Sequence, residues 1–95
     1  MRLEVSARAA RDIEGIFIYG LKHFGVAAAR TYYQRLFDLF DVIAATPLMA
    51  RERSELKFKS RVVIFGSHVV FYRTDEKRVR IVRVLHGRQD WGKHL

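Results

Sequence analysis

Seven basic residues lie on or beside the segments expected to form the last strands of the chain: Arg61, Arg73, Arg78, Arg80, Arg83, His86 and Arg88. An arginine beside a histidine can cleave a phosphodiester, because histidine transfers a proton and arginine stabilises the charge that develops on the phosphate. Arg73, Arg83 and His86 are the three that would form such a ribonuclease site. Basic surfaces also bind RNA or protein without cutting them, so the set alone predicts only an anionic partner.

Arg83 is the most constrained member of this set. Strict alternation along the last strand gives it the face that also carries Val79, Ile81 and Leu85. A guanidinium on an apolar face must pair with a carboxylate or lie at the floor of a groove, because an unpaired buried charge is very costly. One interpretation is that Arg83 pairs with Asp90 or Glu14 and fixes the C-terminal segment. The other is that it lines an anion-binding site together with His86 and Arg88.

Two further members of the basic set, and one tryptophan, are also candidates for binding a target or a partner. Arg61 directly precedes the first of these strands. Arg73 follows Phe71-Tyr72 at the end of the second, where the alternative is an ordinary solvated strand end. Trp91 has no periodic partner, so it either folds back as a hydrophobic clamp or belongs to a contact surface. Aromatic residues at helical spacing earlier in the chain are predicted to be core: Tyr32, Tyr33, Phe37 and Phe40.

Other routes to catalysis are poorly represented. The chain has no cysteine, which excludes a disulfide framework, a thiolate nucleophile and a thiolate metal site. The four histidines fall at no metal-ligand spacing, and no glycine-rich phosphate loop is present. Glu52 and Glu55 are three residues apart, but Arg51 and Arg53 flank them, which indicates a solvated charge cluster. We therefore expect neither a metal nor a cofactor.

The net charge of +8 is concentrated in the second half of the chain. Residues 1–50 carry six Lys or Arg against five Asp or Glu, whereas residues 51–95 carry twelve against five. Segregation of this kind favours an anionic partner, either nucleic acid or an acidic protein segment. No apolar run is long enough to span a bilayer, so we expect a cytoplasmic protein without membrane contact.

The first half of the chain is predicted to form a strand and two helices. Alternation over residues 2–5 indicates a short strand, and Ser6 is a good N-cap for the helix that follows. Gly25 can adopt positive φ and so ends this helix. The apolar stripe of residues 26–45 predicts a second helix, antiparallel to the first.

The second half is predicted to form three strands. Residues 62–65 and 69–72 flank Gly66-Ser67, which suits a two-residue hairpin turn. A further β-branched run follows at residues 79–85, and residues 86–95 are expected to be irregular. The predicted fold class is therefore α+β, in the order β-α-α-β-β-β, with the helical hairpin packed on one face of a small antiparallel sheet. Residues 1–95 are expected to form a single domain.

Two motifs near the C-terminus resemble the ParE branch of the RelE/ParE toxin family. They are Val-Val-Phe-Tyr-Arg at residues 69–73 and Ile-Val-Arg-Val-Leu-His-Gly-Arg-Gln-Asp at residues 81–90. The front of the chain agrees, with an opening strand, a Ser-x-x-Ala helix start, Phe24-Gly25 at the helix junction, and a helix that ends near Thr46-Pro47. The resemblance covers nearly the whole chain and implies the RelE fold.

This resemblance implies the toxin of a type II toxin–antitoxin pair that inhibits DNA gyrase and so blocks replication. It also implies a ParD-like antitoxin, a dimeric ribbon-helix-helix DNA binder that wraps the toxin with its C-terminal segment. The two would form a hetero-oligomer that meets operator DNA only through the antitoxin. The expected contact residues for target or antitoxin are Arg61, Arg73, Arg83, His86, Arg88 and Trp91.

Two alternatives stay open. A RelE-type toxin would cleave mRNA on the ribosome, and Arg61, Arg73 and Arg83 match positions where that branch carries basic residues. His86 falls near its terminal acid, but no tyrosine follows the last strand here, which disfavours ribonuclease activity. The second alternative is a family member that is not toxic and serves as a binding or regulatory module.

An antitoxin is also expected from the residues themselves. Residues 80–85 carry apolar side chains on both faces, whereas the helical hairpin covers only one face of the sheet. An acidic amphipathic helix or an added strand would cover the other.

Overall fold

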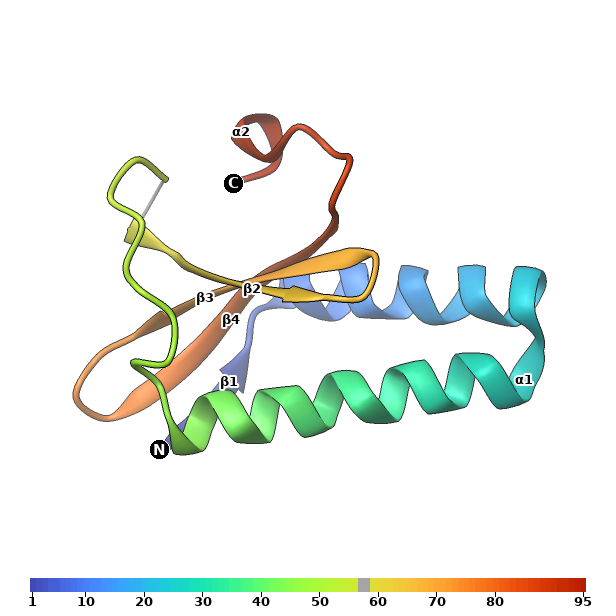
Figure 1. The fold of residues 1–95 in the computed structure, drawn as a ribbon, viewed down its shortest axis with the longest axis horizontal. Coiled ribbons are helices and arrows are strands. Elements are labelled where there is room, and N and C mark those ends of the chain that lie inside the picture. The colour runs from blue at the N-terminus through green and yellow to red at the C-terminus, as the bar shows by residue number, and fades with distance from the viewer. Residues whose placement is uncertain (57–58) are drawn as a thin grey trace.

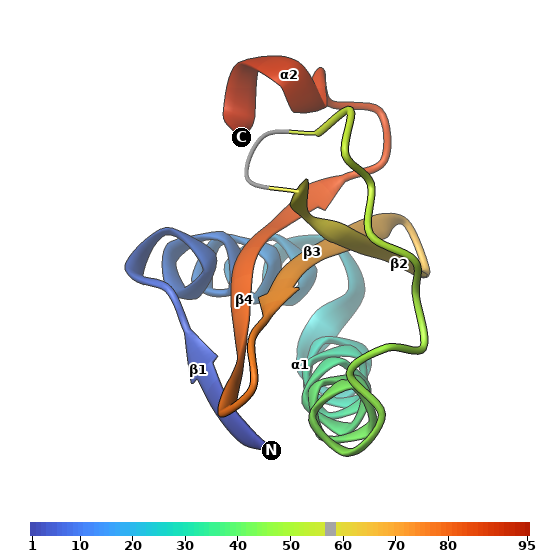
Figure 2. The ribbon, with the colours of Figure 1, turned by 90° about the vertical axis from the view of Figure 1, so that its left-hand side faces the viewer.

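The chain forms one four-stranded sheet, with a long helical hairpin on one face and a short C-terminal helix on the other (Figure 1, Figure 2). The structure is a computed structural model and describes residues 1–56 and 59–95. Its elements are β1 (Arg2–Val5), α1 (Ala7–Ala45), β2 (Arg61–Phe65), β3 (His68–Thr74), β4 (Arg78–His86) and α2 (Trp91–His94). The predicted α+β arrangement is confirmed.

Both predicted helices lie within α1, which reverses direction at Gly25. Ser6 caps the start as expected, because its hydroxyl oxygen accepts from the Ala9 N–H at 3.0 Å. Gly25 has φ 86° and ψ 170°, and the two halves of α1 run antiparallel on either side of it (Figure 1). In the described part of the chain, no helix is both long and apolar enough to cross a membrane.

The strand order is β1-β4-β3-β2. The pairs β2–β3 and β3–β4 are antiparallel, which confirms the predicted meander. The pair β1–β4 is parallel, so the prediction of an antiparallel sheet was wrong for this strand. The reason is that the helical hairpin returns the chain to the end of the sheet where it began. The Met1 amino group donates to the Ala44 carbonyl at 3.0 Å, so β2 starts from the same end as β1. The strand β3 runs back, and β4 again runs in the direction of β1.

A β-bulge in β4 changes which residues share a face. Phe71 pairs with Arg83, whereas the next residue, Tyr72, pairs with Ile81, which leaves Val82 as an extra residue. Ile81 therefore faces the helical hairpin, whereas Arg83 faces away from it with Phe71. The prediction that Arg83 shares a face with Val79 and Ile81 was wrong, because it assumed unbroken alternation.

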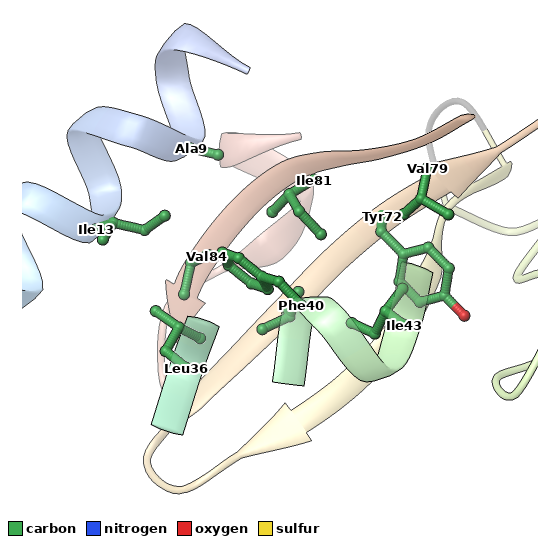
Figure 3. Close-up of a cluster of buried hydrophobic side chains, with 10 residues drawn as sticks. Ala9, Ile13, Leu36, Phe40, Ile43, Tyr72, Val79, Ile81 and Val84 are labelled. Carbon is green, nitrogen blue, oxygen red and sulfur yellow. The ribbon is translucent and has the colours of Figure 1, made fainter. Parts of the chain in front are cut away.

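Two apolar clusters result, one on each face of the sheet. The inner cluster joins the helical hairpin to the sheet through ten buried residues, among them Phe40, Tyr72 and Ile81 (Figure 3). The outer cluster has Val69, Phe71 and Leu85 as its buried residues, and partly buried side chains cover them: Leu56, Val62, Trp91 and Leu95.

The C-terminal segment, which we expected to be irregular, contains the short helix α2. The Asp90 side chain caps it by accepting from the Gly92 N–H at 3.1 Å. Trp91 lies edge-on against Phe71, with ring centroids 5.3 Å apart. Of the two interpretations of Trp91, the structure therefore favours the hydrophobic clamp.

Candidate functional site

A cleft of about 790 Å³ opens between the two halves of α1. The turn between β2 and β3 and the end of β4 close it at one end, where Ser67, His68 and His86 line it. Its walls are largely apolar and aromatic, with Phe17, Tyr19, Phe24, Tyr32, Tyr33 and Leu36 among them. We call it the interhelical cleft. Its size and largely apolar lining are typical of a binding pocket.

The aromatic residues predicted as core divide between the core and this cleft. Phe40 is fully buried and Phe37 is partly buried, as expected. Tyr33 is 41% exposed, and Tyr32 also lines the cleft. At the open end, Tyr19 and Phe24 are 58% and 69% exposed. So much exposed aromatic surface on one side indicates a binding face.

Tyr32, His68 and His86 form a polar cluster at the closed end of the cleft. The Tyr32 hydroxyl donates to the Phe65 carbonyl at 3.1 Å and lies 2.7 Å from Nδ1 of His68. His68 pairs with His86 across the sheet, and their rings lie 5.5 Å apart. Burial raises the pKa of Tyr32, and burial followed by the nearby His86 lowers the pKa of His68. Both shifts favour the neutral forms, so the pair offers hydrogen bonds rather than charge.

Gly66 allows Tyr32 to approach the hairpin turn. It has φ 55°, as the predicted two-residue turn requires. A Cβ atom at this position would lie 2.7 Å from the Tyr32 hydroxyl. The turn therefore needs glycine for its backbone and for its contact with the helix.

Arg83 pairs with Asp12, not with Asp90 or Glu14 as the sequence suggested. Its Nε and one terminal nitrogen donate to the two Asp12 carboxylate oxygens at 2.7 and 2.9 Å. Another terminal nitrogen donates to the His94 carbonyl, which fixes the C-terminal segment as that interpretation expected. Asp12 also accepts from the Val84 N–H at 3.0 Å, so it caps the edge of β4 beyond the end of β1. Arg83 is 8% exposed, and hydrogen bonding to Asp12 raises its pKa.

The His-Gly-Arg-Gln-Asp motif of residues 86–90 closes on itself as a turn. The His86 N–H donates to the Gln89 side chain at 2.6 Å, and Nδ1 of His86 accepts from the Arg88 N–H at 3.1 Å. Gly87 donates to the Ser67 carbonyl at 2.9 Å. The motif thus ties the end of β4 to the β2–β3 turn, and the Arg88 side chain is exposed.

Arg61 and Arg73 lie elsewhere. Arg61 donates to the Ala50 carbonyl and so holds the segment after α1 against the sheet. In the strand register, Arg73 of β3 lies opposite Arg80 of β4. His86 lies opposite His68, which is five residues before Arg73 on β3, so the two positions are about 17 Å apart along the strand. The structure therefore does not bring Arg73 and His86 to one site.

The sequence did not identify three of these residues as site residues: Asp12, Tyr32 and His68. Their partners are 71, 36 and 36 residues away in the chain. The apolar periodicity of the first helix places Asp12 on its exposed side. Asp12 reaches Arg83 and Val84 only because the folded chain places this helix beside the edge of β4. A possible signal for His68 was its position directly after the glycine turn. In the described residues, no group of three His, Cys, Asp or Glu is placed to hold a metal ion.

Comparison with known proteins gives consistent matches. Residues 3–91 match the family described as the ParE toxin of the type II toxin–antitoxin system parDE. The chain is 37% identical over 91 residues to Toxin ParE1 of Caulobacter vibrioides, covering 96% of this chain and 94% of that protein. It is 35% identical over 95 residues to Toxin ParE1 of Mycobacterium tuberculosis, covering 99% and 97%.

A solved structure has the same fold. It is a chain of the chromosomal ParDE toxin–antitoxin system of P. aeruginosa, with a TM-score of 0.78 and 17% identity. The match covers 90% of this chain and 95% of that one.

Proposed function

Because the chain belongs to the ParE toxin family and is the toxin component of a type II toxin–antitoxin system, we propose that it stops growth by binding DNA gyrase and blocking replication. It acts as a single domain, by contact and without catalytic turnover. DNA gyrase works on the chromosome, so the proposed place of action is the cytoplasm.

The arrangement of the basic residues supports binding over cleavage. Arg83 is held by Asp12 and by the His94 carbonyl, so its guanidinium already has partners. Nδ1 of His86 is engaged within its own turn. Arg73 and His86 lie about 17 Å apart along the sheet, too far to act on one phosphate. This separation is the observation that favours binding over cleavage, and membership of the ParE family is what supports gyrase as the target.

We propose that a ParD-like antitoxin neutralises the toxin by filling the interhelical cleft. An amphipathic helix with a few large apolar side chains fits its aromatic walls. Arg11 lines the same cleft, which favours an acidic segment. The antitoxin would carry the operator-binding ribbon-helix-helix domain, so the toxin reaches operator DNA as part of a hetero-oligomer.

The experiment is induction of the chain alone in a bacterium, with DNA and protein synthesis followed separately by uptake of labelled precursors. We expect DNA synthesis to stop first, with an SOS response. Early loss of protein synthesis would instead support a ribosome-dependent ribonuclease. Growth without arrest would support a binding module without toxicity.

Arg88 is the clearest candidate for a target contact, because its side chain is exposed at the turn. We expect Arg88→Ala to weaken inhibition of supercoiling by purified gyrase. Arg30→Ala, which removes an exposed arginine from the second half of α1, is the matched control. Equal inhibition by both variants would remove Arg88 from the proposed contact.

A further inference from the structure

The outer face of the sheet carries an arginine stripe, which we define as Arg2, Arg8, Arg73, Arg78 and Arg80. In the strand register, Arg2 of β1 lies opposite Arg78 of β4, and Arg73 of β3 lies opposite Arg80 of β4. Residues two apart on a strand share a face, so these rows lie about 7 Å apart on the side away from the helical hairpin. Arg8, in the first turn of α1, extends the stripe beyond the edge of the sheet.

A hollow of about 290 Å³ lies within the stripe. Arg8, Arg73 and Arg80 line it together with Ser6, Val82 and the C-terminal His94 and Leu95. Arginines from one helix and two strands thus converge on one concave surface. Such a hollow is suited to an anion that several guanidinium groups can contact at once.

Carboxylates neutralise only part of this charge. Glu4 lies 3.0 Å from Arg78, 3.7 Å from Arg80 and 3.9 Å from Arg2, so one carboxylate serves three arginines. Asp75 lies 3.5 Å from Arg78. Among the described residues, these five arginine and two carboxylate side chains have formal charges that sum to +3. Arg83 borders the hollow but is already neutralised by Asp12.

We propose that the hollow and the arginine stripe bind backbone phosphates of double-stranded DNA. Sharing one carboxylate among three arginines leaves guanidinium N–H groups for an incoming phosphate, and the side chains of Arg78 and Arg80 are 47% and 48% exposed. The charge is spread across three strands, which suits a polyanion with evenly repeated phosphates. A peptide ligand would need apolar pockets for its side chains, and the interhelical cleft supplies these on the opposite side of the sheet.

The proposal is independent of gyrase and of any antitoxin. The toxin would hold DNA itself, on a surface separate from the interhelical cleft. In the presence of gyrase, the same surface would bind the DNA on which the enzyme acts. Failure of the gyrase proposal would leave a DNA-binding result intact, because the test below contains the toxin and nucleic acid alone.

The test is fluorescence anisotropy of a short labelled DNA duplex titrated with the full chain over a range of salt concentrations. The variant Arg73→Ala/Arg80→Ala removes two members of the hollow, and Arg30→Ala/Arg35→Ala removes two exposed arginines of α1 as the charge-matched control. We expect the hollow variant to lose at least about tenfold in affinity and about two units of salt slope, and the control to lose much less.

Several outcomes would overturn the proposal. They are equal losses in the two double variants, no measurable duplex binding by the wild type, or equal competition by poly-glutamate and unlabelled duplex at matched charge. Circular dichroism and thermal unfolding establish that each variant folds. Arg80→Lys supplies a second variant that keeps the charge and loses the planar fork, and we expect it to bind between wild type and Arg73→Ala/Arg80→Ala.

Discussion

The two faces of the sheet bury apolar side chains by different means. The inner face is covered by both halves of α1, and its ten buried residues come from the first and second halves of the chain (Figure 3). Among the described residues, the outer face has a cluster of three buried apolar residues, and α2 lies over it across the sheet from α1 (Figure 2). Beyond this cover, the outer face is lined with arginines.

This difference separates the part that determines the fold from the part available for binding. The apolar side chains of the helical hairpin are buried against the inner face, and this packing holds the sheet in place. The outer cover is short and is held by a few specific contacts, chiefly those of Arg83 and Trp91. We therefore expect changes on the inner face to unfold the protein, and changes on the outer face to act locally, with Arg83 as the exception that links both.

The largest effect is expected at the centre of the inner cluster. Phe40→Ala should lower the free energy of unfolding by about 4 kcal/mol, because it leaves a cavity between α1 and the sheet. Phe71→Ala removes the same atoms from the outer cluster and should cost about 2–3 kcal/mol, since α2 can move to fill the space. Urea denaturation measures both values. A Phe71→Ala loss as large as that of Phe40→Ala would contradict the distinction between the faces.

Arg83→Ala should lower the free energy of unfolding by about 3 kcal/mol, because it leaves the Asp12 carboxylate without its partner in a largely buried place. Arg88→Ala, in the turn that follows β4 and exposed, should change it by less than about 0.5 kcal/mol. The double variant Asp12→Ala/Arg83→Ala should lose less than the sum of the two single losses, again measured in urea. Additive losses would show that the pair contributes nothing as a pair.

Trp91→Ala should cost about 2 kcal/mol, because it removes the ring that covers Phe71. Hydrogen exchange should show faster exchange at residues 92–95 and unchanged exchange in α1. Trp91→Phe is the control, and we expect it to be nearly neutral. It keeps a ring against Phe71 and removes an indole N–H that is buried without an acceptor among the described residues. Faster exchange throughout α1 would mean that the outer cover is part of the folding core.

The smallest effect is the pH dependence from His68 in the interhelical cleft. Burial lowers its pKa in the folded protein below the ordinary value of 6.5. The unfolded chain then takes up the proton first as the pH falls, so this stability is present above pH 6.5 and is lost as the pH falls through the lowered folded pKa. His68→Gln, which keeps a hydrogen-bonding group near Tyr32, should lose less stability than wild type between about pH 7.5 and about pH 5.5. Identical losses in the two proteins would assign the pH dependence to other groups.

Local signals predicted most of the fold. The apolar stripes of α1, the glycine at its reversal and the glycine of the β2–β3 turn each act over a few residues, and the structure confirms all three. The direction of β1 and the bulge at Val82 depend on long-range packing, which no short window contains. The bulge matters most, because it moves Arg83 to the opposite face from the one that alternation predicts.

For the candidate site, the sequence could predict the types of residue involved but not their contacts with one another. The sequence predicted that basic residues of the last strands face an anionic partner, which stays a prediction, and the packing of Trp91 on Phe71 agrees with one of its two interpretations. It did not indicate that Asp12 neutralises Arg83, nor that Arg73 joins Arg8 and Arg80 across the sheet. Such partnerships arise from register and from the path of α1, which are set by the whole fold.

The reversal at Gly25 also allows both halves of α1 to pack on the sheet of their own chain. A straight helix of 39 residues would be about 58 Å long at 1.5 Å per residue, whereas the longest extent of the molecule is 39 Å. The combination of φ 86° and ψ 170° at Gly25 is one that only glycine adopts without strain. A side chain here favours the straight helix, and its second half would then reach the sheet of another copy. We therefore expect a Gly25→Val chain to form domain-swapped dimers, and a strictly monomeric variant in size-exclusion chromatography would contradict this expectation.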